Sequence, residues 1–328
     1  MRALSGFRVL TLVGAVAAAC TPPTVSNDAG ASVAQACADV AYARCSRIAT
    51  CSSWAIAARY GSEAACEKGL VAFCQNDFAA PSSGRNVAKA EACAAAVPTW
   101  ACADDLVGQN PPPECQPQAG GLGQGSPCAF NDQCTSARCQ FPPGGACGAC
   151  APPVATGDPC SDPADCGGGF SCSSDTSTCA PFVVAGGACG FGMPCLDGLR
   201  CVGASGDGGT LGTCQESVTT PGAACDPAGA QCSNYAGLTC DTQSKQCTTA
   251  TFVGGGQPCG LVGTGVVYCT AGLCVGSGST YACQAFSDLG GPCDVAAGPG
   301  CVQPARCIVT GGAGTSGACA IPDATKCQ

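Results

Sequence analysis

Apolar positions recur at helical spacing early in the chain. Residues 31–58 contain no Pro or Gly. Within them, apolar residues fall three or four positions apart, at Val33, Cys37, Ala41, Cys45 and Ile48. This period places them on one face of a helix, so the pattern predicts one amphipathic helix over residues 31–58.

A second helix is predicted directly after Gly61. Ser62 is a typical N-cap residue, and the following "EAACEKGLVAFC" carries Cys66, Leu70 and Cys74 at helical spacing. Gly61 itself serves as the stop signal of the first helix. The two segments therefore predict a helical hairpin that turns near Gly61.

Two shorter helices are predicted to complete this module. The Ala-rich stretch 86–97 ends at Pro98, which cannot continue a helix. The stretch "TWACADDL", residues 99–106, suggests one further short helical turn. We expect the aromatic residues here to pack in the core. These are Tyr42, Trp54, Phe73 and Trp100. Residues 31–115 thus form a predicted α-helical module.

The cysteines of the module suggest its cross-links. Cys37 and Cys45 are eight residues apart, as are Cys66 and Cys74, so each pair lies on one side of its helix. In an antiparallel hairpin closing near Gly61, positions equidistant from the turn meet. Among the 105 connectivities open to eight cysteines, this geometry favours four bridges. They are Cys51–Cys66, Cys45–Cys74, Cys37–Cys93 and Cys102–Cys115.

The pattern changes after a Gly-rich linker at residues 116–124. From residue 125 onward a unit recurs that opens with Gly or Pro near a cysteine, as in "GSPC", "GDPC" and "GGPC". Six units are predicted, starting near residues 125, 157, 186, 221, 256 and 290. Four cysteines per unit suffice for two local bridges. The predicted fold is a small disulfide-rich protein, in which the helical module precedes an elongated array of loop and short-β repeats.

Two cysteines, Cys147 and Cys327, fall outside the four-per-unit scheme. They either pair with each other or break the local pattern. Cys147-Gly-Ala-Cys150 is a CxxC sequence, which is typical of zinc half-sites and redox pairs. A second CxxC, a histidine and a βαβ context are all missing, so we predict structural disulfides for both cysteines.

Composition supports a scaffold held by disulfides. The 328 residues include 35 Cys, 48 Gly and 24 Pro. Leu, Ile, Val and Phe together supply roughly 15% of the residues, below the roughly 20% that an ordinary core needs. Disulfides must replace that core, and they persist only in an oxidising compartment. The protein is therefore expected to be exported.

Charge and the missing histidine narrow the function. The net charge is -9, which disfavours nucleic acid and anionic lipid surfaces as partners. The absence of histidine excludes Ser/His/Asp and Cys/His catalysis and His-ligated zinc. The acidic loops "NDQC", "SDPADC" and "GASGDGG" lack the alternating carboxylates of a calcium loop, so we interpret them as solvated turns. No metal or cofactor is expected.

The first thirty residues predict an export signal and an anchor. Residues 1–19 join an Arg-containing start to an apolar run of signal-peptide length. "AAAC" resembles a bacterial lipobox, in which Cys20 receives a diacylglyceryl group. Parity agrees, because 35 is odd and pairing all 34 cysteines from Cys37 onward leaves Cys20 alone. Residues 20–30 are polar and form a predicted lipidated tether. In a gram-negative host, Thr21 resembles the outer-membrane sorting pattern.

These features together resemble known sequences. "GSPCAFNDQCTSARCQ" with "GDPCSDPADCGGGFSC" resembles the Dickkopf N-terminal cysteine-rich motif, over residues 125–180. The whole layout is similar to predicted cysteine-rich surface lipoproteins of gram-negative bacteria. The resemblance implies a small disulfide fold and a general protein-binding role, and it carries no receptor-contacting residue to this chain.

We therefore predict a non-enzymatic lipoprotein, held to outer-membrane lipid through Cys20 on the cell surface or the periplasmic face. It would act as a structural or adhesive array that binds an extracellular protein or glycan. One alternative is a soluble secreted inhibitor or ligand-binding protein. Another is an extracellular thiol-disulfide enzyme or hydrolase, which would need a reactive Cys147/Cys150 pair or two converging acids.

Overall fold

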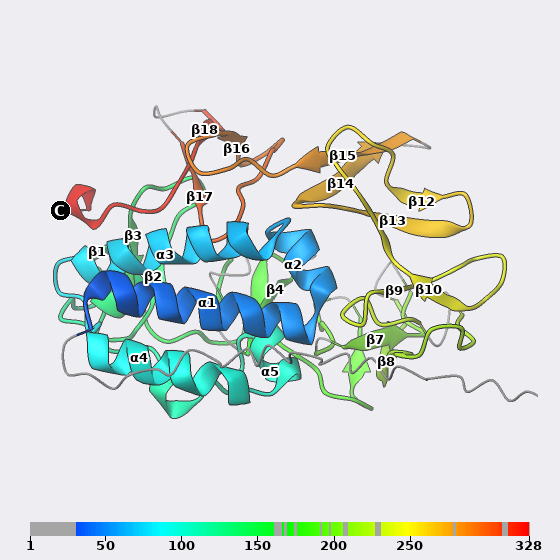
Figure 1. Ribbon diagram of the computed structural model, residues 1–328, viewed down its shortest axis with the longest axis horizontal. Coiled ribbons are helices and arrows are strands. Elements are labelled where there is room, and N and C mark those ends of the chain that lie inside the picture. The colour runs from blue at the N-terminus through cyan, green and yellow to red at the C-terminus, as the bar shows by residue number, and fades with distance from the viewer. Residues whose placement is uncertain are drawn as a thin grey trace, which may run out of the picture.

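The computed structural model describes most of the chain downstream of residue 30. It covers residues 31–160, 166, 169–173, 176–190, 192–196, 198–205, 209–226, 231–277, 280–309 and 314–327. The predicted signal peptide (1–19) and lipidated tether (20–30) lie outside the described residues. Helices come first along the chain, and short strands fill the rest (Figure 1).

The helices of the N-terminal module lie side by side (Figure 1). They are α1 Val33–Cys51, α2 Ser53–Arg59, α3 Glu63–Ala79, α4 Val87–Ala96 and α5 Cys102–Val107. Short 3-10 turns are η1 Val97–Thr99, η2 Pro113–Cys115, η3 Asn131–Gln133 and η5 Ala324–Lys326. None of the described helices is long and apolar enough to cross a lipid bilayer.

Side-chain N-caps fix the starts of four of the five α-helices. Ser62 accepts a hydrogen bond from the amide of Ala65 at the start of α3, and Asn86 does the same for Lys89 in α4. The predicted second, third and fourth helices are thus confirmed. The core prediction holds for Trp100, which is 8% exposed, and fails for Tyr42, which is 55% exposed.

The predicted single helix over residues 31–58 is wrong, because it is broken at Ser52. This residue is extended, with φ -163° and ψ 99°, and its hydroxyl accepts from the amide of Ala55. Ser52 therefore ends α1 and caps α2. A serine can break a helix in this way without Gly or Pro, because its side chain replaces a missing backbone partner.

The four predicted bridges of the helical module are also wrong. In place of Cys51–Cys66, Cys45–Cys74, Cys37–Cys93 and Cys102–Cys115, the structure holds a different set. It consists of Cys37–Cys74, Cys45–Cys66, Cys51–Cys102 and Cys93–Cys115. The antiparallel α1–α3 arrangement and the eight-residue spacing are as expected. The register differs because the break at Ser52 moves the midpoint of the hairpin to Ala55 and Ile56, inside α2.

Short strands follow, all of six residues or fewer. They are β1 Pro127–Cys128, β2 Cys139–Gln140, β3 Gly148–Cys150, β4 Phe170–Ser173, β5 Thr178–Pro181, β6 Ala188–Cys189, β7 Leu199–Val202, β8 Gly212–Glu216, β9 Leu238–Cys240, β10 Cys247–Thr249, β11 Thr251–Val253, β12 Gly260–Val262, β13 Gly265–Cys269, β14 Gly272–Ser277, β15 Thr280–Ala285, β16 Pro292–Asp294, β17 Arg306–Val309 and β18 Ser316–Ala320. We number the cysteine units repeats 1 to 6 in chain order.

One disulfide pattern serves all six repeats, in which the first cysteine bonds the third and the second bonds the fourth. The 1–3 bonds are Cys128–Cys139, Cys160–Cys172, Cys189–Cys201, Cys225–Cys240, Cys259–Cys274 and Cys293–Cys307. The 2–4 bonds are Cys134–Cys150, Cys166–Cys179, Cys195–Cys214, Cys232–Cys247, Cys269–Cys283 and Cys301–Cys319. The predicted two local bridges per unit are confirmed.

The strands of each repeat also pair in one common register. The third and fourth cysteines face each other in antiparallel register, as in Cys139↔Cys150 and Cys307↔Cys319. In repeats 1, 3 and 6 the fourth-cysteine strand is the middle of three. Leu122 pairs with Cys134 in this scheme, so part of the predicted linker at 116–124 belongs to repeat 1.

A glycine three residues before each first cysteine starts every repeat. The positions are Gly125, Gly157, Gly186, Gly222, Gly256 and Gly290, and all have positive φ. Each donates its amide to the carbonyl of its repeat's fourth cysteine, as from Gly256 to Cys283 at 2.7 Å. Only a residue without a Cβ adopts this conformation at low cost.

Gly256→Ala is expected to lower the free energy of unfolding by about 1–2 kcal/mol, the cost of a left-handed backbone for an L-residue. Nothing lies within 4 Å of a Cβ built there, so strain and not a clash causes the loss. Gly254→Ala is the matched control, because its surroundings are equally open and its φ is not positive. Denaturant unfolding of both variants checks this, and equal losses would refute the strain argument.

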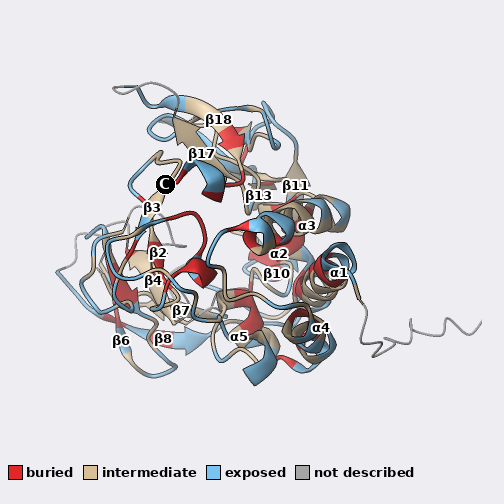
Figure 2. Cartoon of the chain, turned by 90° about the vertical axis from the view of Figure 1, so that its left-hand side faces the viewer, coloured by how far each residue is buried: buried red, intermediate tan, exposed pale blue. Residues whose placement is uncertain are grey.

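The predicted elongated array is corrected, because the repeats fold back onto the helical module. Figure 2 views the module nearly along its helices and shows repeats around one side of it. Phe130 of repeat 1 meets Phe73 of α3 with ring centroids 5.2 Å apart. The amide of Ala271 in repeat 5 donates to the carbonyl of Ala57 in α2.

A single disulfide closes this arrangement. Cys147 in repeat 1 bonds Cys327 near the C-terminus, 180 residues away in sequence. Ile321 and Ala324 of the C-terminal segment pack into a buried cluster with Ala129 and Phe130. The array therefore closes on itself against one side of the helical module and is not a projecting row of beads.

Candidate functional site

Every cysteine in the described part of the chain belongs to a disulfide bond. All 34 cysteines from Cys37 to Cys327 are bonded, in 17 pairs. The parity prediction is confirmed in this respect, since every described cysteine has a partner. The predicted lipidation residue, Cys20, lies outside the described residues.

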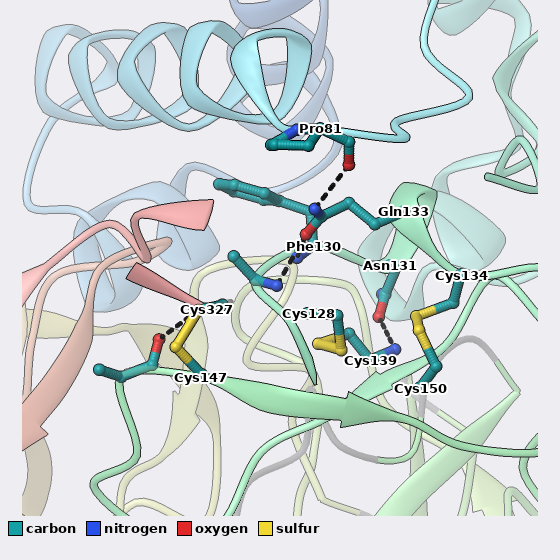
Figure 3. The surroundings of a disulfide bond; sticks show 12 residues. Pro81, Cys128, Phe130, Asn131, Gln133, Cys134, Cys139, Cys147, Cys150 and Cys327 are labelled. Atoms are coloured by element: carbon teal, nitrogen blue, oxygen red, sulfur yellow. Dashed lines mark hydrogen bonds between the residues drawn. A yellow bond between two sulfur atoms is a disulfide. The ribbon is translucent and has the colours of Figure 1, made fainter. Parts of the chain in front are cut away.

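The CxxC sequence is divided between two bonds (Figure 3). Cys150 bonds Cys134 inside repeat 1, whereas Cys147 bonds Cys327. Because β3 is extended, residues three apart point to opposite faces and lie too far apart to bond each other. The predicted structural use of Cys147 and Cys150 is confirmed, and the two are not a redox pair.

Groups of three cysteine sulfurs lie within 4.8 Å of one another in several repeats, including Cys128, Cys134 and Cys150. Such groups resemble metal sites by distance alone. Their members are all in disulfides, whose sulfurs lack the thiolate that binds zinc. These groups are therefore the disulfide centres of the repeats.

Two carboxylates share one guanidinium where α3 meets repeat 1. The Nε of Arg85 lies 2.8 Å from Oδ2 of Asp77 and 2.6 Å from Oδ2 of Asp132. The Ser83 hydroxyl donates to Asp77. Burial raises the pKa of Asp77 to about 6, against the lowering effect of Arg85. Asp77 and Asp132 are thus a converging acid pair of the kind that the hydrolase alternative requires, but both are paired with the permanently charged guanidinium of Arg85.

We expect the contribution of Asp77 to the free energy of unfolding to fall as pH rises from about 4 to 7. The folded state holds the Asp77 proton more tightly than the unfolded state, so ionisation favours unfolding. Asp77→Asn should remove this slope and raise the free energy of unfolding at pH 7 by on the order of 1–3 kcal/mol. Arg85 keeps Asp132 as its partner in the variant. Denaturant unfolding across this range measures both chains, and parallel pH profiles would contradict the assignment.

A second buried ion pair is structural. Arg44 of α1 pairs with Asp105 of α5, and its guanidinium lies 4.4 Å from the ring centroid of Trp100. Burial raises the pKa of the Asp105 carboxyl, an effect opposed by Arg44. The cluster joins α1 to α5 beside the Cys51–Cys102 bond.

Turn aspartates in the repeats are saturated by protein donors. Asp294 accepts from the amides of Ala296 and Ala297 and from the hydroxyls of Thr315 and Ser316. These hydrogen bonds lower the pKa of its carboxyl. Asp132 of the "NDQC" loop pairs with Arg85. The aspartates of the "SDPADC" and "GASGDGG" loops lie outside the described residues.

A groove of about 850 Å³ lies between α2 and repeats 5 and 6. This volume is within the range of ligand sites. Its lining is mainly apolar and includes Leu273, Val275 and Val295, which are 56%, 40% and 42% exposed. The Asp294 carboxylate is the acidic group of the lining and already has four donors.

Residues 251–287, which contain all four cysteines of repeat 5, form one side of this groove and contain no Asp, Glu, Lys or Arg. Each of the other five repeats carries charged residues. Further exposed apolar side chains gather on repeat 5, with Leu261 at 65%, Val262 at 42% and Tyr281 at 45%. An uncharged, apolar and exposed surface of this kind is typical of protein interaction sites.

No family model, no curated protein and no solved structure matches this chain.

Sequence reasoning missed this surface and the shared guanidinium of Arg85. A signal for the first was present, because residues 246–287 form an uninterrupted run without charge. The second depends on a loop after α3 that brings Arg85 back to Asp77 and Asp132. No motif spacing encodes that return.

Proposed function

We infer from the heavy disulfide content that this is an extracellular structural or binding protein. We propose that it is an exported, non-enzymatic lipoprotein, anchored to the outer membrane through Cys20 and serving as a rigid binding module. The observation that supports this most is the cysteine count. All 34 cysteines from Cys37 onward have partners, and Cys20 is the remaining one of 35.

The geometry suits an anchor at the N-terminal end. The tether enters the fold at Ser32, the N-cap of α1. In Figure 1 the start of α1 and the C-terminus lie at the same end of the long axis. The α1 helix then runs about 28 Å, at 1.5 Å per residue, towards α2 and repeat 5. An anchored protein would therefore present repeat 5 at the end remote from its lipid.

Lipidation is tested by labelling cells with radioactive palmitate. The wild-type protein should incorporate label, and Cys20→Ser should incorporate none. A thiol titration of the denatured, unreduced mature protein gives an independent readout, because a thioether at Cys20 leaves no free thiol. One free thiol per wild-type chain and no label would instead support the soluble secreted alternative.

A further inference from the structure

We propose that repeat 5 is a self-association surface, through which a second copy of this chain pairs along the free edge of β14. This inference names a partner for the binding role proposed above, and it rests on that proposed function. The argument uses the backbone of repeat 5, its exposed side chains and the charge of the whole chain.

The free edge of β14 follows from the hydrogen bonds of its neighbour β15. Cys283 donates to Gln257 and accepts from Gly256, so its backbone faces the strand of the first cysteine. Along a strand, the backbone N–H and C=O groups of successive residues point to alternate sides. The backbone groups of Ala282 and Gln284 therefore face β14, opposite Val275 and Leu273.

The alternate residues of β14 consequently direct their amides and carbonyls outward. These are Gly272, Cys274 and Gly276. No other described strand pairs with β14 on that side, and residues 273–276 are all exposed. An edge of unpaired backbone groups binds another extended chain and has much less affinity for a lipid or a glycan.

Repeat 5 lacks the features that usually protect such an edge. The corresponding strands of repeats 3 and 6 carry Arg200 in β7 and Arg306 in β17. At six residues, β14 is longer than either, and it carries Leu273 and Val275 in place of a charge. A charge or a proline on an edge strand normally prevents pairing between molecules.

The unpaired edge of β14 can pair with a copy of itself, and charge decides where two copies can meet. Two chains of net charge -9 repel each other over most of their surfaces. The uncharged residues 251–287 of repeat 5 are where like-charged copies approach at least electrostatic cost. Antiparallel pairing of β14 with β14 of the partner is two-fold symmetric, which is the commonest symmetry of protein dimers. In it, Leu273 and Val275 of the second copy would pack against the groove that Leu273, Val275 and Val295 line.

Sedimentation of the mature chain carrying Cys20→Ser tests the proposal without the lipid. We expect a concentration-dependent dimer that added salt strengthens, because salt screens the repulsion between acidic copies. Leu273→Lys and Val275→Lys should each weaken association at least about tenfold, since every substitution occurs twice in a symmetric interface. Both side chains are exposed, so the monomer should keep all its disulfides, which mass analysis verifies.

Leu211→Lys is the matched control, because Leu211 is 54% exposed in repeat 3 and lies outside repeat 5. It should leave the dimer unchanged. A monomer at every concentration, a dimer that neither Leu273→Lys nor Val275→Lys weakens, or equal weakening by Leu211→Lys would overturn the proposal. Palmitate labelling is independent of these results, so failure of self-association and failure of the lipoprotein proposal are distinguishable.

Discussion

A chain carrying Cys147→Ser and Cys327→Ser is expected to be less stable than the wild type and to expand. The bond closes a span of 180 residues. Removing a disulfide that closes a loop of more than 100 residues lowers the free energy of unfolding by at most about 5 kcal/mol. The local bridges already shorten the unfolded chain, so we expect a smaller loss of about 2–4 kcal/mol. Denaturant unfolding measures the loss, and X-ray scattering in solution measures the increase in radius of gyration.

The expansion has a specific origin. Without the bond, the C-terminal segment is held mainly by the packing of Ile321 and Ala324 against Ala129 and Phe130. Hydrogen exchange in residues 319–327 should therefore accelerate. The control is Cys160→Ser with Cys172→Ser, which opens a span of 12 residues inside repeat 2 and should leave the radius unchanged. An unchanged radius and unchanged exchange after loss of Cys147–Cys327 would contradict the closed arrangement.

Removing the Cys45–Cys66 bond should damage the helical module most. We expect Cys45→Ala with Cys66→Ala to lower the free energy of unfolding by about 3–5 kcal/mol. Both cysteines are 0% exposed, and the buried face of α3 consists of Cys66, Cys74 and Asp77. These sulfurs therefore stand where leucines would normally pack. The loss of helical circular dichroism on heating measures the effect.

The Cys93–Cys115 bond provides a matched control. Its sequence separation is 22, against 21 for Cys45–Cys66, so the two bonds restrict the unfolded chain equally. The sulfurs of Cys93 and Cys115 belong to half-buried residues. Cys93→Ala with Cys115→Ala should therefore cost about 1–2 kcal/mol less, the share that comes from core packing. Equal losses would show that the buried sulfurs do not replace a core.

Local signals in the sequence predict local structure in this protein. Ser62 and Asn86 start helices as expected, because an N-cap acts within three residues of itself. The cysteine spacing likewise predicts six repeats with two bridges each. The break at Ser52 escaped prediction, because a serine favours either a helix end or an exposed helical position, and packing of α2 against repeats 4 and 5 decides between them.

The long-range disulfide pairings of the helical module were predicted wrongly because the helix break at Ser52 was missed. A shifted midpoint of the hairpin changes every partner of Cys37, Cys45, Cys66 and Cys74 together. The path of the array is not encoded locally either. It follows from contacts such as the donation from Gln133 Nε2 to the carbonyl of Pro81 at 2.8 Å, which no repeat pattern reveals (Figure 3). The scheme of four cysteines per repeat identifies Cys147 and Cys327 as exceptions but leaves their pairing open.

Mass mapping of disulfide-linked peptides from the unreduced protein tests the account most directly. The closed scaffold predicts one linked pair containing Cys147 and Cys327, and separate pairs for Cys45–Cys66 and Cys37–Cys74. A bond from Cys147 to another cysteine of repeat 1, with Cys327 free or paired elsewhere, would contradict it.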